Sequence, residues 1–274
     1  MFGDYAYGTE ILNLPPVGEP FKPIAQESLQ PLESVTDRDM VFDAIQTYWF
    51  RWITGHQIML TLWHILNKHM QQIDHYDEQA VTLYTRIIKG TTLVFEYTGS
   101  CTEVYYQKNI RPYMLLTHKA FSGKWASDYI GMPKNIQNIF SKKDISESTK
   151  KQLCLLRKAH NISQKTHLGV AKKLVPEGVS LLKDAKQEGY AYEQAEEHHQ
   201  QLFDAFFLVR RTPISAAAVT HNLARRLHVV IDDLNQNPLT ESLFNPSEAI
   251  ELIQDTQNAI KTLTLYHPTQ DTEV

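Results

Sequence analysis

Apolar residues recur at intervals of three and four along residues 37–69, which is the spacing of one face of an α-helix. Three tryptophans lie in or beside this stripe, so the helix is expected to be buried and to organise the rest of the chain. The stripe consists of Val41, Ile45, Tyr48, Trp52, His56, Met59, Trp63 and Leu66.

One member of this stripe, His56, is titratable. It follows Gly55, so an imidazole faces the interior beside a position that has no side chain. His56 is therefore either a core histidine with one satisfied nitrogen, or a base or hydrogen-bond donor above a buried ligand for which Gly55 leaves room.

The same period predicts further helices. They are expected over about 78–97, then up to about 109, and over 176–189, 190–209, 212–235 and 246–266. Pro112 should end the third helix and leave Arg111 at its end, since the residue before a proline is disfavoured in the helical region. Residues 133–173 are polar and lysine-rich and predict short helical fragments without evident chemistry. No run alternates as a half-buried strand does, so the fold class is expected to be all-α, a helical bundle.

The first 36 residues differ from the rest because they are rich in proline and show little periodicity. The prolines are Pro15, Pro16, Pro20, Pro23 and Pro31. Residues 1–36 are expected to form an extended arm, which either lies over the domain or a neighbouring subunit or is a surface tail. Residues 37–266 are expected to form a single helical domain, and 267–274 a disordered tail.

Composition excludes several classes of function. The net charge is −4 and neither half is strongly basic, so nucleic acid is not an expected partner. The N-terminus does not resemble a signal peptide, and no apolar run reaches about 18 residues, so no membrane segment is expected. The chain has two cysteines without close spacing, which favours a reducing compartment, and we expect a cytoplasmic protein.

The region 111–131 has the most unusual composition in the chain. Within it, Phe121-Ser122-Gly123 presents a hydroxyl and an unobstructed backbone. The region either contacts a ligand or is an ordinary irregular connection. The residues that stand out are Arg111, His118, Ser122, Gly123, Trp125 and Asp128.

Residues 190–209 carry a second histidine on an apolar stripe. The stripe consists of Tyr192, Ala195, His199, Leu202, Phe206 and Val209. His199 is expected to face inward, whereas His198 lies about 100° away around the helix. His199 is either a core histidine or an axial ligand to a flat porphyrin.

Four arginines lie close to the two ends of the next predicted helix. Arg210 and Arg211 precede it, and Arg225 and Arg226 lie in its second half. Such arginines either pair with two propionates or form a solvated face.

Three features in this order resemble the tryptophan 2,3-dioxygenase superfamily of heme proteins. The long first helix carries Thr54-Gly55-His56-Gln57 followed by Leu62-Trp63. Arg111 then precedes the loop Phe121-Ser122-Gly123, and a histidine-bearing helix follows about eighty residues later. The resemblance extends over residues 41–213.

Two departures favour a particular branch of that superfamily. The chain lacks the Gly-Thr-Gly-Gly run of the tryptophan dioxygenases, and its loop reads Ala-Phe-Ser-Gly-Lys-Trp at 120–125. Together with residues 206–213, this variant is similar to the heme-dependent L-tyrosine hydroxylases and the proteins grouped with the pyrrolnitrin-pathway enzyme.

The resemblance implies a role for individual residues. It implies that His199, with His198 as the fallback, binds the iron of heme b, and that His56 stands on the distal side as the catalytic residue. Arg111 would pair with the substrate carboxylate, and Ser122 and Gly123 would line the pocket near the heme edge. The aromatic substrate ring would lie among Tyr48, Trp52 and Trp125. Arg210 and Arg211 are the candidates for the propionates.

The implied activity is hydroxylation of L-tyrosine at the 3-position in natural-product biosynthesis, with peroxide or dioxygen as oxidant. An oxygenase acting on L-tryptophan or indole is the first alternative. A non-catalytic or metal-binding helical protein is the second, although Glu196 and His199 form only one Glu-x-x-His pair and a di-iron bundle needs two. A homo-oligomer, dimer or tetramer, is expected.

Overall fold

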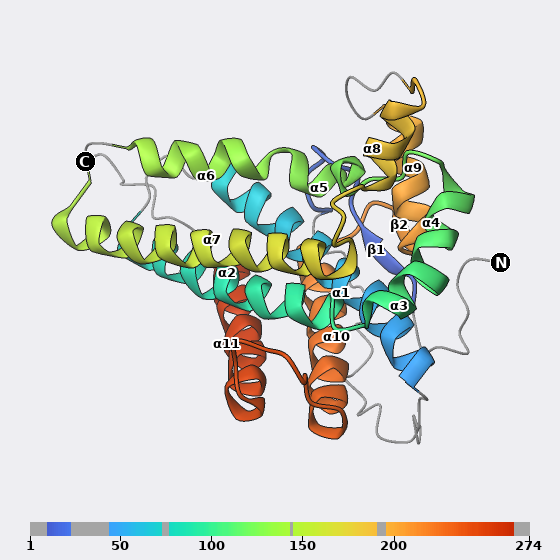
Figure 1. The fold of residues 1–274 in the computed structure, drawn as a ribbon. Helices are drawn as coiled ribbons and strands as arrows, with labels where there is room; N and C mark the ends of the chain where they lie inside the picture. The colour runs from blue at the N-terminus through green and yellow to red at the C-terminus, as the bar shows by residue number, and fades with distance from the viewer. Residues whose placement is uncertain (1–9, 23–43, 73–76, 143–144, 191–195, 266–274) are drawn as a thin grey trace.

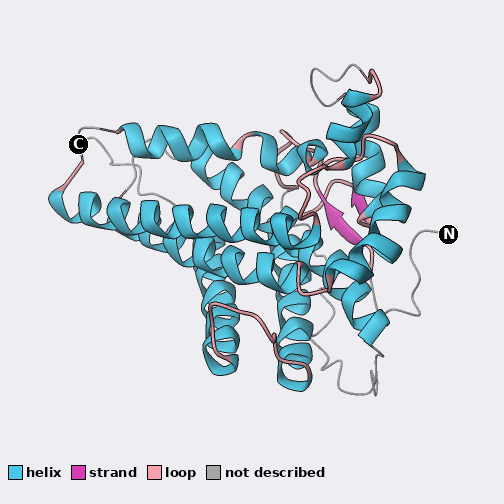
Figure 2. Cartoon of the chain, viewed as in Figure 1, coloured by secondary structure: helices cyan, strands magenta, loops and turns pink. Residues whose placement is uncertain are grey.

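The computed structural model describes residues 10–22, 44–72, 77–142, 145–190 and 196–265, and helices dominate it (Figure 2). The longer helices are α1 (Ala44–Gln72), α2 (Glu78–Thr98), α6 (Met132–Ser141), α7 (Glu147–Leu174), α9 (Glu197–Phe206), α10 (Ala216–Gln236) and α11 (Pro246–Leu265). The expected all-α fold class is confirmed. The expected division into arm, domain and tail stays a prediction, because 1–9, 23–36 and 267–274 lie outside the described residues.

Helix α2 lies at the centre of the bundle. It packs against α1, α7 and α11, and Figure 1 shows α7 running alongside it while α10 and α11 project to one side. Its N-terminus is capped by Asp77, whose side chain accepts a hydrogen bond from the Ala80 amide at 2.8 Å. Neighbours on several sides explain why most residues of α2 are buried.

Four of the expected helices are confirmed. α1, α2, α10 and α11 overlap the expected ranges, although residues 37–43 lie outside the described part of the chain. α9 is shorter than expected and begins at Glu197, with the expected positions Tyr192 and Ala195 outside the described residues. None of the helices in the described ranges combines the length and apolar character needed to cross a bilayer.

The expectation that Pro112 ends a helix is wrong. The chain continues as a helix through α3 (Glu103–Tyr105), a π-helical turn η3 (Tyr106–Ile110) and α4 (Arg111–Thr117). A proline has no amide hydrogen and its ring clashes with the preceding turn, and the wider π turn accommodates both. Arg111 therefore lies inside a helical segment instead of at its end.

The region 111–190 is also more ordered than expected. A short turn η4 (Gly123–Trp125) and α5 (Ser127–Ile130) interrupt the predicted loop. Residues 147–174 form the 28-residue α7, where only short fragments were predicted. The helix expected to begin at Pro176 is α8 (Leu181–Gln187), which is capped by Ser180.

The described residues include two short strands, which the sequence did not predict. β1 (Leu12–Leu14) pairs in parallel with β2 (Val209–Arg211). Leu12 and Leu14 are fully buried, so the pairing attaches this part of the N-terminal arm to the domain.

Gly55 is needed for the contact between α1 and α2. A Cβ atom at this position would lie 1.9 Å from the Oγ1 atom of Thr98 on α2. The missing side chain therefore allows two helices to approach, instead of leaving room for a ligand as the sequence suggested.

The free energy of unfolding of the Gly55→Ala variant is expected to be lower by about 1–3 kcal/mol, because overpacking a close helix contact forces the backbones apart. Urea denaturation of the purified protein measures this difference. Gly169→Ala is the matched control: Gly169 also lies in a helix, but no atom lies within 4 Å of its built Cβ. The control should gain about 0.5–1 kcal/mol from the higher helix propensity of alanine. Equal stability changes in the two variants would contradict the steric explanation.

Candidate active site

A cavity of about 630 Å³ lies among α1, α2, α6, α7 and the 118–126 region. This volume is within the range of small-molecule sites. Most of its lining is apolar or aromatic, including Met59, Leu60, Phe95, Phe121, Ile136 and Phe207. An aromatic ligand of low polarity fits such a lining.

His56 faces this cavity from α1. Its Nδ1 atom donates to the Trp52 carbonyl oxygen at 2.6 Å, because a carbonyl can only accept. The Nε2 atom therefore keeps its lone pair. Burial, and then the nearby charge of His167, lower the pKa of His56 to about 4. At neutral pH the ring is an uncharged imidazole with a hydrogen-bond acceptor at Nε2.

Aromatic neighbours fix the orientation of the His56 ring. It stacks on Phe207 with ring centroids 4.0 Å apart and an interplanar angle of 17°. Trp52 lies against it at 4.5 Å. A ring held on two sides has little freedom to rotate.

The cavity is also lined by residues of α7, where the sequence analysis found no chemistry. They are His160, Ser163, Gln164 and His167, with Val170, Ala171 and Leu174 further along the helix. Their spacing of three, four and seven places them on one helical face, and this is the signal that was available in the sequence. The many lysines of the other face obscured it.

His167 is one of three histidines that line the cavity, together with His56 and His160. Its ring stacks on Phe95 at 4.8 Å, and burial lowers its pKa. In the described ranges neither ring nitrogen has a hydrogen-bond partner. His56 and His167 line the same cavity, so the two imidazoles share one site.

His199 is buried as expected, with 4% of its surface exposed, whereas His198 is exposed. The residues lining the cavity do not include His199. Its Nδ1 atom accepts from the Glu196 amide at 3.2 Å, so Nε2 carries the hydrogen and donates to the Tyr190 hydroxyl at 2.9 Å. Both nitrogens are thus engaged at the first turn of α9.

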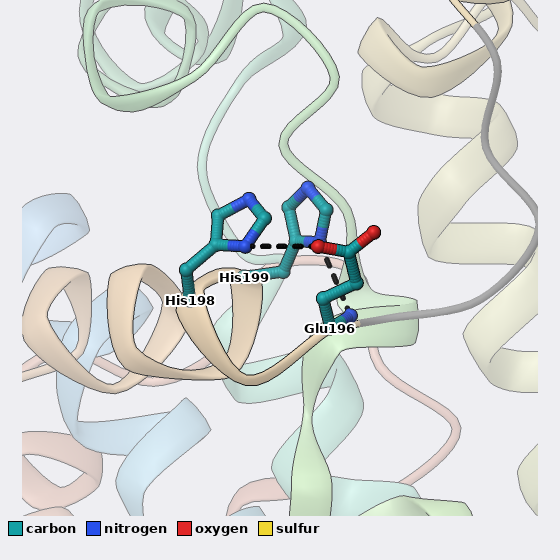
Figure 3. Close-up of side chains that lie close together, drawn as sticks. All are labelled: Glu196, His198 and His199. Carbon is teal, nitrogen blue, oxygen red and sulfur yellow. Dashed lines mark hydrogen bonds and ion pairs between the residues drawn. The ribbon is translucent and has the colours of Figure 1, made fainter.

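A possible metal-ligand group nevertheless exists at this turn. Figure 3 shows Glu196, His198 and His199 together, and their potential ligand atoms lie within 4.8 Å of one another. The Glu196 carboxylate lies 3.3 Å from His198 Nδ1. A metal at His199 would have to displace one of the hydrogen bonds that its ring makes.

The other site candidates are divided between the cavity and its surroundings. Trp52, Ser122 and Gly123 line the cavity. Tyr48 packs against Tyr105 at 5.2 Å instead, and Trp125 is fully buried beside His199 at 4.5 Å.

Arg111 is paired within the protein. Its Nη2 atom donates to Asp184 at 2.6 Å and to the Val179 carbonyl at 3.2 Å, and Arg111 does not line the cavity. Its role toward a substrate carboxylate stays a prediction that requires breaking this ion pair.

Arg211 is likewise engaged, in a network with two carboxylates. It donates to Asp128 at 2.7 Å and to Asp204 at 2.8 Å, whereas Arg210 is exposed on β2. His64 Nδ1 also lies 2.8 Å from Asp128. Burial would raise the pKa of Asp128, but His64 and Arg211 together hold it below its usual value. The propionate role of these arginines stays a prediction, and the observed contacts are structural.

Residues 9–141, just under half of the chain, match the family described as SfmD 3-methyl-L-tyrosine peroxygenase. This segment of the chain is similar to that family. No curated protein matches the chain. The family is one of oxidising enzymes, so the predicted enzyme class and the resemblance to heme-dependent aromatic oxygenases are confirmed. The segment of this chain that matches the family contains His56, Ser122 and Gly123. It ends before α7 and α9 begin.

Proposed function

We propose that this protein is a heme-dependent peroxygenase that adds one hydroxyl group to the ring of L-tyrosine, or of a ring-methylated L-tyrosine, during natural-product biosynthesis. The observation that carries the proposal is the mostly apolar cavity faced by His56 and His167, in a chain whose first half matches a tyrosine peroxygenase family. The family description names the methylated substrate, and the sequence analysis favoured L-tyrosine hydroxylated beside the phenol oxygen.

The cavity fits a heme by its chemistry. Its walls are largely apolar, and the pKa values of His56 and His167 are lowered, which keeps both in the uncharged form that binds iron. A bound heme would supply the activation of peroxide from which one oxygen atom passes to the substrate. We assign the iron to His167, which stacks on Phe95 at the cavity wall and whose ring nitrogens are both uncommitted among the described residues; His160, which also lines the cavity, is the alternative on α7. The sequence-based assignment to His199 stays a competing prediction.

His56 then acts on the substrate side. Its Nε2 lone pair can accept the hydrogen of the substrate phenol or of the peroxide, while its Nδ1 hydrogen stays on the Trp52 carbonyl. A pKa of about 4 means that the ring does not retain the proton at neutral pH, so it can pass the proton on. His56 therefore relays a proton and does not stay protonated at neutral pH.

The aromatic walls hold the substrate ring. Trp52, Tyr106, Phe121 and Phe207 all line the cavity, and the rings of Trp52 and Phe207 contact the His56 ring. Flat rings in edge-to-face or offset contact stabilise one another by about 0.5–1.5 kcal/mol per pair beyond burial. This end of the cavity is where a phenol is oriented toward His56.

Titration of the purified protein with hemin tests the proposal. A Soret band typical of histidine-ligated heme is expected, and hydrogen peroxide with L-tyrosine or 3-methyl-L-tyrosine should give a product heavier by one oxygen atom. Absence of the Soret band would refute heme binding. Conversion of L-tryptophan to a product with two added oxygen atoms would favour the dioxygenase alternative instead.

A further inference from the structure

The residues that line the cavity have an unusual distribution of charge. Among the described residues that line it, Lys124 is the single lysine or arginine, and none is an aspartate or glutamate. A site with one cation and no acidic side chain favours an anionic group at the cation.

The backbone at Lys124 is held in place while its side chain is exposed. The Ser122 hydroxyl accepts from the Lys124 amide at 3.3 Å, and the next residue, Trp125, is fully buried. No atom lies within 4 Å of the position that a Cβ of Gly123 would occupy, so the approach beside Lys124 is open. The Lys124 side chain therefore extends from an ordered backbone, and its ammonium group is accessible to a ligand.

Lys124 is also uncommitted. Over the described ranges its Nζ atom makes no ion pair or hydrogen bond, in contrast to Arg111, which is bound to Asp184. Lys119, five positions earlier, lies over the Tyr190 ring at 5.5 Å and does not line the cavity.

We infer that Lys124 is the carboxylate-binding residue of this site. The inference rests on the proposed function, which brings two kinds of carboxylate to the cavity, that of the amino acid and the propionates of heme. Among the described residues that line the cavity, no other lysine or arginine could pair with either carboxylate. Lys124 pairs with it at the mouth, where water still solvates both groups, while the aromatic part enters toward His56.

Two pairs of probes distinguish the sources of the carboxylate. L-tyrosine and tyramine differ by the substrate carboxylate, and hemin and hemin dimethyl ester differ by the propionates. Lys124→Ala should weaken binding of the acid in one of these pairs by about tenfold or more and leave its uncharged counterpart unchanged. Lys124→Arg should keep most of the affinity. Lys119→Ala is the matched control, and it should leave the affinity for all four probes unchanged.

The readout is the dissociation constant, measured by calorimetry for the amino acid and by absorbance for hemin. L-tyrosine and tyramine are titrated into the protein both before and after hemin addition. A selective loss of affinity for either acid, L-tyrosine or hemin, supports the inference. Unchanged affinity for both acids in Lys124→Ala overturns it, and so does a selective loss that appears in Arg111→Ala instead. Failure to bind hemin would refute the proposed function, whereas the titration of L-tyrosine without hemin would still decide the role of Lys124.

Discussion

The His167→Ala variant should lose heme retention almost completely, with the Soret band of the purified protein reduced at least tenfold. The reason is that an apolar cavity alone holds a porphyrin weakly, and removing the iron ligand also removes the group that fixes its orientation. His167 stacks on Phe95, so the alanine variant leaves a void at the cavity wall and not in the centre of the core. Absorbance of the variant after hemin titration and gel filtration measures the effect, and circular dichroism checks the helical fold.

Two other histidine variants serve as controls for this assignment. His56→Ala should retain heme but lose most of the hydroxylation rate, because it removes the acceptor at Nε2 and not the ligand. His199→Ala should retain heme as well, because its two nitrogens bind Glu196 and Tyr190. Loss of heme in His199→Ala alone would show that the sequence-based assignment is correct and that the α7 assignment is wrong. Loss of heme in His56→Ala alone would exchange the roles of His56 and His167.

Asp128→Ala should destabilise the fold by about 3 kcal/mol or more. The side chain of Asp128 is fully buried and ionised, and it accepts from Arg211 and His64 at once. Removing a buried carboxylate leaves buried donors without their partner, which typically lowers stability by about 3–5 kcal/mol. Arg211 retains Asp204, so the lower end of this range applies. Chemical denaturation measures the loss.

The surface pair of Arg86 and Asp255 provides the comparison. Its geometry is also that of a close arginine–carboxylate pair, at 2.6 Å, but the two side chains are 32% and 42% exposed. Asp255→Ala should therefore change stability by less than about 1 kcal/mol. If both aspartate variants lost the same stability, burial of the Asp128 network would not be what stabilises it.

The sequence predicted the helical architecture where the signal is local. Apolar residues at helical spacing predicted α1, α2, α10 and α11, because each of these helices buries a continuous face. The position of His56 on such a face was sufficient to predict its burial near the interior. Short motifs around His56 and Phe121 also indicated the family, since they record chemistry and not packing.

Other features depended on contacts between distant segments. The sequence suggested that Pro112 ends a helix, but a π turn just before it continues the helix. The strands β1 and β2 are three residues each, and neither forms without its distant partner. Gly55 was interpreted as space for a ligand, whereas its neighbour is Thr98 of another helix.

The site itself shows the same division between local pattern and tertiary contact. Sequence reasoning selected His199, Arg111 and Arg211 because histidines and arginines of these kinds bind iron and carboxylates. The structure gives each of them partners inside the protein, and it places His167 and Lys124 on the cavity instead. The sequence by itself determined the helices α1, α2, α10 and α11 and the resemblance to the heme-dependent aromatic oxygenases, because periodicity and short motifs are properties of neighbouring residues. Only the tertiary structure decided which charged and titratable groups remain uncommitted, because pairing depends on segments that meet in space.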